Sequence, residues 1–423
     1  MVSRGSFRQM TRSLFDLASG DIPARLCGIA SLLILARKWG VLFVGVYALA
    51  QSMVQYTYPF IDFGLRHVGA RLIAKYPQAG GQIVERVQRR RMLMAVAILP
   101  LLLGYALLSN TPFQLKMFLF FFSAMSCLYA VSLEWAAWGK ENMRLIGATK
   151  MMIPGSVLLF LLLGLRSQHV LWWLVAGNAV GYIAQGIVFY RWWRKWRPAG
   201  EPRINLAAIR ESLAWSRTSI MGLAWFCNLA FNTIDMLMLG VMSNPHQVGL
   251  YSAAYRTMNQ VLFTYYLLMQ ILYPRHAKQD AAGRARALRP RIFVTLFAVG
   301  SAIALLLSVS RKLVLDIVFG HQFLGATLLL ALLAWAIPLD FLTSYLSNAY
   351  IAWSMEKKVL ICTAVGAGSN VILNLIWIPA YGATAAAVNT LFSYLIFLIS
   401  LALAGRFAKE LAPERRAMPE LAG

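Results

Sequence analysis

The sequence predicts an all-helical integral membrane protein, and two observations lead to that class. Of the 423 residues, 59% are hydrophobic and only 13% are charged, and the mean hydropathy is +0.62. Soluble chains carry about a quarter charged residues. The apolar residues also gather in twelve stretches, each close to the ~20 residues that a helix needs to cross a bilayer. We therefore expect about twelve transmembrane helices.

The predicted spans divide evenly between the two halves of the chain. Basic residues precede the first span, and no small-residue cleavage site follows it, so we do not expect a removable signal peptide. The spans cover 14–36, 42–63, 92–109, 114–138, 150–166 and 170–190, and then 216–241, 250–274, 292–310, 326–351, 359–378 and 384–405.

A weak internal repeat supports a duplicated plan. Residues 35–50 (LARKWGVLFVGVYALA) align without a gap with residues 239–254, at an offset close to half the chain length, and Tyr47 matches Tyr251. Such duplication is common in transporters. We expect a six-helix lobe over 1–197, a cytoplasmic linker over 198–210 and a second six-helix lobe over 211–423.

The basic residues predict the orientation of the chain. Of the 40 Lys and Arg residues, 32 lie at the termini and in alternate loops, and six lie on the opposite side. Cytoplasmic loops hold the basic excess, so both termini are expected in the cytoplasm. The net charge of +24 comes from these short clusters, which does not indicate a nucleic-acid partner. This assignment leaves Arg25 and Arg256 as the only two basic residues within spans.

The stretch 228–256 (NLAFNTIDMLMLGVMSNPHQVGLYSAAYR) places two charges where charges are costly. Asp235 lies inside one span, the chain breaks at Ser243-Asn244-Pro245, and Arg256 lies about two turns into the next span. A charge at mid-helix costs roughly 2.5 to 3.5 kcal/mol on insertion scales, so it usually faces a bundle interior or a watery cavity. Asp235 could bind a coupling ion or a proton, or it could hold Arg256 in position.

Other polar residues within spans allow two interpretations. Asp62 and Glu134 fall near cytoplasmic helix ends, where we expect water to reach them, and either a role in capping or in pairing with a loop, or a functional role, fits. Asn232 adds a polar group beside Asp235. Asn370 and Asn374 share a helix face, which suits hydrogen bonding between helices or contact with a sugar.

The cysteines and histidines do not form a metal site. The four cysteines lie in apolar segments without a CxxC pair, and the five histidines are scattered, so we expect no metal and no cofactor. The aromatic and basic run at 190–197 (YRWWRKWR) is typical of an interfacial anchor between the halves.

Three segments resemble one family of transporters. They are LARKWGVLFVGVYALAQSMVQYTYPFIDFGL at 35–65, IDMLMLG followed by VGLYSAAYR at 234–256, and NVILNLIWIPAYGATAAAV at 370–388. Their order and spacing are similar to those of the oligosaccharide flippases in the multidrug/oligosaccharidyl-lipid/polysaccharide exporter superfamily. The chain departs from the family pattern at Trp39-Gly40-Val41, in place of Leu-Gly-Pro. It departs again at Arg71-Leu72, in place of Arg-Glu, which leaves a salt bridge there unsupported.

This resemblance implies a fold, a substrate and a route. It implies two lobes with pseudo-two-fold symmetry, as in multidrug and toxic compound extrusion (MATE) transporters, around a cavity that opens alternately to each side. The substrate would be a polyprenyl-diphosphate-linked glycan that enters through a lateral portal in the bacterial inner membrane. Arginine suits a diphosphate because its planar guanidinium makes paired, charge-assisted hydrogen bonds. The candidate substrate-binding residues are Arg25, Arg256, Asp235, Asn232, Asp62 and Glu134.

Three functions remain open on the sequence alone. The leading one is a flippase for O-antigen, capsule or exopolysaccharide assembly, working with membrane lipids and with the polymerase and chain-length proteins of the same pathway. The second is a cation-coupled drug or metabolite exporter of the same superfamily. The third is a membrane glycosyltransferase or polymerase, which the short outer loops disfavour. The sequence does not indicate an oligomeric state.

Overall fold

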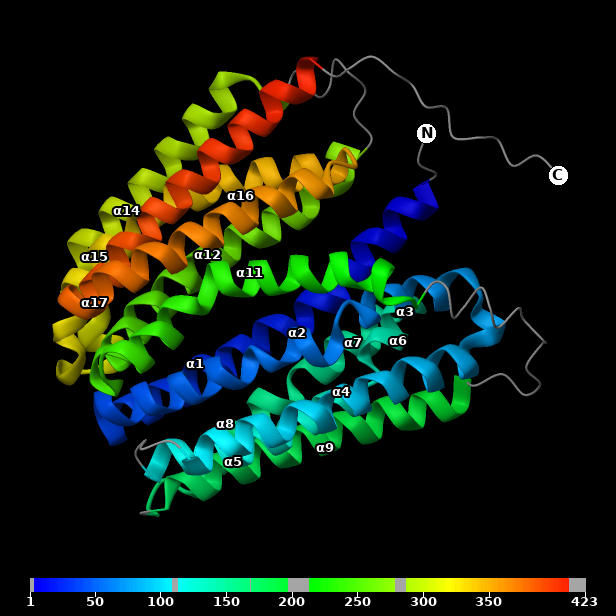
Figure 1. The fold of residues 1–423 in the computed structure, drawn as a ribbon, viewed down its shortest axis with the longest axis horizontal. Coiled ribbons are helices and arrows are strands. Elements are labelled where there is room, and N and C mark those ends of the chain that lie inside the picture. Colours follow the sequence, from blue (N-terminus) through cyan, green and yellow to red (C-terminus); the bar gives the residue numbers. More distant parts are fainter. Residues whose placement is uncertain (1–3, 109–112, 168, 197–212, 278–286, 411–423) are drawn as a thin grey trace. The chain divides into compact units, whose positions relative to one another are not determined.

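The computed structural model describes residues 4–108, 113–167, 169–196, 213–277 and 287–410, and every regular element in these ranges is a helix (Figure 1). The helices of the first half are α1 (Arg4–Gln55), α2 (Thr57–Asp62), α3 (Leu65–Lys75), η1 (Pro77–Ala79), α4 (Gly80–Leu108), α5 (Phe113–Val131), α6 (Glu134–Gly139), α7 (Met143–Lys150), α8 (Met152–Leu163) and α9 (Val170–Trp196). Those of the second half are α11 (Trp215–Met242), α12 (Pro245–Ala277), α14 (Pro290–Phe319), η2 (His321–Ala326), α15 (Thr327–Ala334), α16 (Ala336–Ala352) and α17 (Glu356–Glu410).

The chain forms two compact units. The first extends to Leu229 and includes Val318–Gln322, and the second contains Ala230–Ile317 and the chain from Phe323 onward. In the first unit α1 packs against α5, α7 and α8, and in the second α12 packs against α15, α16 and α17. The predicted linker at 198–210 lies outside the described residues, so the lobe boundaries stay a prediction.

Once two long helices are divided and the bent pair is counted, the membrane-crossing segments among the described residues match eleven of the twelve predicted spans. The twelfth, 250–274, lies in α12, which is not among these segments. Among the described residues, eight segments are long and apolar enough to cross a membrane, or nine if the bent pair His321–Ala334 and Ala336–Ala352 counts as one span. Two of the eight, Ser19–Asp62 and Glu356–Gly405, are 44 and 50 residues long. Each therefore has the length of two spans, and each contains two of the predicted ones.

Both long helices break at a glycine. Gly40 in α1 has φ 76° and ψ −173°, and Gly382 in α17 has φ 56° and ψ −134°. These conformations are open to glycine and strained for other residues. In the alignment of the two halves, Gly40 lies opposite Asn244, which separates α11 from α12 and whose side chain accepts a hydrogen bond from the Gln247 amide at 3.0 Å. Both copies of the repeat thus interrupt the helix at the same position, by different means.

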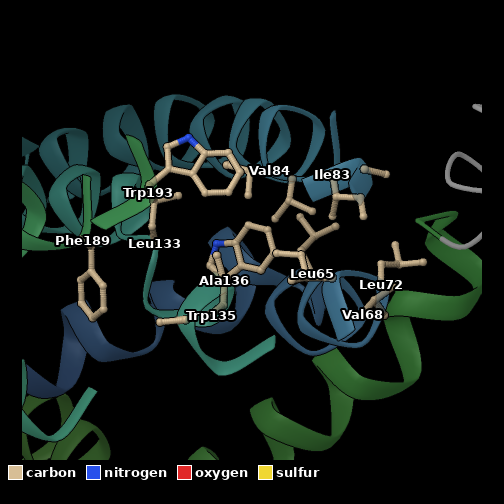
Figure 2. Packing of buried hydrophobic residues seen from close by; sticks show 14 of the residues in the cluster. Leu65, Val68, Leu72, Ile83, Val84, Leu133, Trp135, Ala136, Phe189 and Trp193 are labelled. Carbon is tan, nitrogen blue, oxygen red and sulfur yellow. The ribbon is translucent and has the colours of Figure 1, made fainter. Parts of the chain in front are cut away.

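A buried cluster of side chains joins α3, α4, α6 and α9. Trp135 lies near its centre and is 2% exposed, with Trp193 and Phe189 of α9 beside it (Figure 2). A Cβ on Gly69 would lie 2.6 Å from the Trp135 ring, so the absence of a side chain allows α3 to approach α6 this closely. Trp193, predicted to be part of an interfacial anchor, is a member of this core.

Asp62 and Arg91 form a fully buried ion pair in the first unit. The Arg91 Nε atom lies 3.2 Å from Asp62 Oδ1, and their side chains are 2% and 0% exposed. Two expectations were therefore wrong: Arg91 was assigned to a cytoplasmic loop, and water was expected to reach Asp62. The basic run at 89–91 looks like a loop in the sequence, but α4 begins at Gly80 and carries Arg91 into the helix bundle.

The pair also satisfies backbone groups at two helix ends, the start of α3 and the end of α5. Asp62 ends α2, and the chain then turns through Phe63 at φ 41° and Gly64 at φ 80°. Asp62 Oδ2 accepts the amide of Arg66 at 3.2 Å in the first turn of α3. Arg91 donates to the carbonyls of Ser132 at 2.9 Å and Tyr129 at 3.1 Å, where α5 ends. Carbonyls at a helix end have no partner within the helix, so Arg91 supplies one.

The break in α1 predicts a stability difference between two glycines of that helix. Gly40→Ala should lower the melting temperature of the detergent-purified protein, because the conformation costs a residue with a Cβ about 1–3 kcal/mol and the new atom would lie 2.5 Å from Gln322 Oε1. Gly28→Ala is the matched control, since nothing lies within 4 Å of its Cβ position. Equal melting temperatures for the two variants would show that α1 does not need the break.

The buried ion pair predicts that a second substitution will recover part of the stability that the first one removes. Arg91→Met should destabilise the protein by about 3–5 kcal/mol, because it leaves the Asp62 charge buried without its partner. The double variant Arg91→Met/Asp62→Asn should recover part of that loss, since Asn can still accept the Arg66 amide. Melting temperature and yield of monodisperse protein measure both effects, and Arg89→Met, on an exposed position of α4, is the control. A double variant less stable than either single variant would contradict the pairing.

Candidate functional site

The candidate residues fall into separate groups within each unit. In the first unit, Arg25 of α1 pairs with Asp21 one turn earlier, with 3.1 Å between Nε and Oδ2. Lys150 of α7 reaches the other oxygen of Asp21 at 2.9 Å. The Arg25 side chain keeps 42% of its surface exposed. Asp21 therefore orients Arg25 and links α1 to α7, while part of the Arg25 side chain remains exposed.

Asp62 and Glu134 differ in their surroundings although both begin or end short helices. Asp62 is enclosed with Arg91 and has no exposed surface. Glu134 is the first residue of α6, and its backbone amide donates to Ser132 Oγ at 3.4 Å, while its side chain is half-buried. The structure thus places Asp62 in a structural ion pair. It places Glu134 at the start of the separate short helix α6, within the predicted span 114–138.

In the second unit, Asp235 is held by neutral donors from two other helices. It is 1% exposed. Tyr251 of α12 donates to Oδ2 at 2.8 Å, Thr390 of α17 donates to the same oxygen at 3.2 Å, and Asn374 of α17 donates to Oδ1 at 2.6 Å. Both carboxylate oxygens are therefore hydrogen-bonded, and the break at Gly382 allows both halves of α17 to reach this point.

The amide network extends beyond Asp235. Asn374 Nδ2 also donates to Asn370 Oδ1 at 2.6 Å, and Asn389 donates to Asn374 Oδ1 at 2.9 Å. Asn370 and Asn374, predicted to share a helix face, do so inside one buried network. Asn232, on the same helix as Asp235, accepts a hydrogen bond at its backbone carbonyl from the Tyr255 hydroxyl.

Arg256 projects from α12 in a different direction from the residue that contacts Asp235. Five residues separate it from Tyr251, which corresponds to about 140° around a helix of 3.6 residues per turn. Its side chain is half-buried. The hydrogen bonds named above give Asp235 neutral partners, so the geometry favours separate roles for Asp235 and Arg256.

Three charged residues that are buried or paired in the structure were not among the predicted site residues. Asp21 could have been found from its spacing of four to Arg25 on the first predicted span. Asp340 is a lone acid in the span 326–351, and in the structure it is 5% exposed on α16 with Ser344 Oγ at 3.4 Å. Arg91 gave no such signal, because it ends a run of three arginines. Among the described residues, no group of three or more His, Cys, Asp or Glu side chains is arranged to hold a metal.

The chain is similar to a known family and to a curated protein. The family model described as "Polysaccharide biosynthesis protein" matches residues 11–279. A protein of Escherichia coli (strain K12) named "Putative O-antigen transporter" is 24% identical over 323 residues, which cover 72% of this chain and 74% of that protein.

Solved structures share the fold at low sequence identity. The lipid II flippase MurJ in an inward closed conformation aligns with a TM-score of 0.68 and 15% identity, over 92% of this chain and 87% of that chain. An inward-facing multidrug resistance transporter of the MATE family, in the MOP superfamily, aligns with a TM-score of 0.61 and 12% identity, over 95% of this chain and 96% of that chain. The predicted fold class is confirmed by these alignments. Because the family model covers more than half of its length, the chain belongs to the polysaccharide biosynthesis protein family.

Proposed function

We propose that this protein is a flippase that moves a polyprenyl-diphosphate-linked oligosaccharide across the bacterial inner membrane by alternating access. The observation that carries the proposal is the family match over residues 11–279, together with the similarity to a relative named as an O-antigen transporter. The product would serve O-antigen, capsule or exopolysaccharide assembly, in which polymerase and chain-length proteins act next. The protein would be a transporter and not an enzyme, with both termini in the cytoplasm.

Arg25 and Arg256 are the proposed contacts for the diphosphate, each in its own unit. An anionic headgroup must leave water to cross the bilayer, and guanidinium groups replace water with charge-assisted hydrogen bonds. The exposed surface of Arg25 supports this role, as does the separation of Arg256 from the face of α12 that contacts Asp235.

Asp235 is the proposed site of energy coupling. A buried carboxylate surrounded by neutral donors carries a charge that burial disfavours, so it gains from binding a proton or a small cation. Its neighbours in the network are hydroxyl and amide groups, whose oxygens suit a hard cation. Asn232 lies on the same helix and supports the position of Tyr255.

Deletion of the gene tests the function directly. The deletion should abolish a surface polysaccharide and leave polyprenyl-linked repeat units on the cytoplasmic side of the membrane, while sensitivity to drugs stays unchanged. Surface glycan staining, analysis of extracted lipids and growth inhibition assays measure the three outcomes. Drug hypersensitivity with normal polysaccharide would favour the exporter function that the MATE-like fold also serves.

The arginine contacts predict a loss of transport without a loss of folding. A hydrogen bond to a charged group contributes about 1.5 to 3 kcal/mol, so Arg256→Ala should slow restoration of surface polysaccharide roughly tenfold or more. Arg256→Lys should restore it in part, because lysine keeps the charge but loses the planar fork. Arg291→Ala, at an exposed position of α14, is the control. Full transport by the double variant Arg256→Ala/Asp235→Ala would instead assign Arg256 to neutralising Asp235.

A further inference from the structure

The first unit contains a half-open cavity with a partly polar lining that the proposed diphosphate contacts do not use. It has a volume of about 180 Å³ and lies among α1, α2, α5, α8 and α9. Its polar lining consists of the side chains of Gln51, Gln55, Tyr58, Asn178 and Tyr182. No lining residue is charged, and all of them lie within predicted membrane spans.

The polar groups of this cavity are only partly used by the protein. The Tyr58 and Tyr182 hydroxyls lie 3.4 Å apart, and Asn178 Nδ2 donates to the Leu174 carbonyl at 2.8 Å. Gln55 is an exposed residue, and among the described residues none makes a hydrogen bond to its side chain. Polar side chains inside a membrane are costly and usually have a function or a partner. The capacity left at Gln55 and in the Asn178 side-chain carbonyl is therefore available to a ligand.

The aromatic wall of the cavity is held rigidly. The Tyr58 ring stacks on Tyr129 with 4.4 Å between centroids. The Arg91 guanidinium, which pairs with Asp62, also lies 5.0 Å from the centre of the Tyr129 ring. The buried ion pair thus fixes Tyr129, and Tyr129 fixes Tyr58. A side chain already held in its binding position loses little conformational entropy when a ligand binds.

The chemistry of this lining selects a neutral, hydroxyl-rich ligand. Amides and phenols both donate and accept hydrogen bonds, as sugar hydroxyls do, whereas a diphosphate is favoured by cationic partners, and metal-ion sites usually include at least one carboxylate. The volume is below the ~300–1,000 Å³ of pockets for drug-sized ligands, so it suits one ring and not a whole repeat unit. We propose that this cavity binds one uncharged sugar ring of the transported glycan, through Gln55, Asn178, Tyr58 and Tyr182.

This inference rests on the proposed function. A comparison of two lipids can test the sugar site separately from the flippase function. Purified full-length protein would be titrated with undecaprenyl diphosphate, and in parallel with the undecaprenyl-diphosphate-linked oligosaccharide extracted from the strain that makes this protein. Wild-type protein should bind the glycan-bearing lipid more tightly. Gln55→Met/Asn178→Leu keeps the side-chain volumes nearly constant and removes the hydrogen-bonding groups, so it should lose that advantage while binding the bare lipid as before.

A milder variant guards against misfolding. Tyr182→Phe removes one oxygen and should weaken binding of the glycan-bearing lipid roughly threefold to tenfold, as expected for one neutral hydrogen bond. Tyr190→Phe is its matched control, because Tyr190 lies two turns further along α9 and is exposed outside the cavity.

The possible outcomes distinguish the two claims. Unchanged binding of the glycan-bearing lipid by Tyr182→Phe and by Gln55→Met/Asn178→Leu would overturn the sugar site and leave the flippase proposal intact. Equal affinity of wild-type protein for the two lipids would do the same. Wild-type protein that binds neither lipid would overturn the proposed function, and the sugar site with it.

Discussion

The first unit depends on the ion pair between Asp62 and Arg91. In an interior of low dielectric constant, either charge alone would cost several kcal/mol, and the pair is tolerated because each member also satisfies backbone groups. Asp62 accepts an amide at the start of α3, and Arg91 donates to carbonyls at the end of α5. Four helices are therefore fixed by two side chains, and the same contacts orient the aromatic wall of the polar cavity through Tyr129.

The second unit treats a buried acid differently. Asp235 accepts hydrogen bonds from neutral donors, the side chains of Tyr251, Asn374 and Thr390. Asp62 instead pairs with a guanidinium. A paired carboxylate keeps a fixed charge, whereas a carboxylate among neutral donors can change its charge by binding a proton or a cation. This physical difference is what separates a structural acid from a candidate for energy coupling, although both are single aspartates within apolar helices.

The proposed substrate, a lipid-linked glycan, has an anionic part and an uncharged part, and each proposed site has side chains of matching chemistry. Guanidinium groups bind an anionic diphosphate well, and Arg25 and Arg256 are the proposed contacts. The uncharged sugars call for groups that donate and accept hydrogen bonds without net charge, which the polar cavity of the first unit contains. A site without cations would also favour the uncharged sugar over the anionic headgroup, because charge-assisted hydrogen bonds are stronger than neutral ones.

The sequence alone determined the class, the helices and the family, because hydrophobic stretches and helix-breaking residues are local properties of the chain. Gly40 and Gly382 lie in the predicted gaps between spans, and the motif at 62–65 ends a helix as its glycine requires. The partners of each charge were decided only by the tertiary structure, because Asp62 and Arg91 are 29 residues apart and Asp235 and Asn374 are 139 apart. Helical periodicity shows which face a residue occupies on its own helix, but not which residue of another helix packs against that face, and so a basic run that resembled a loop concealed the arginine that holds the first unit together.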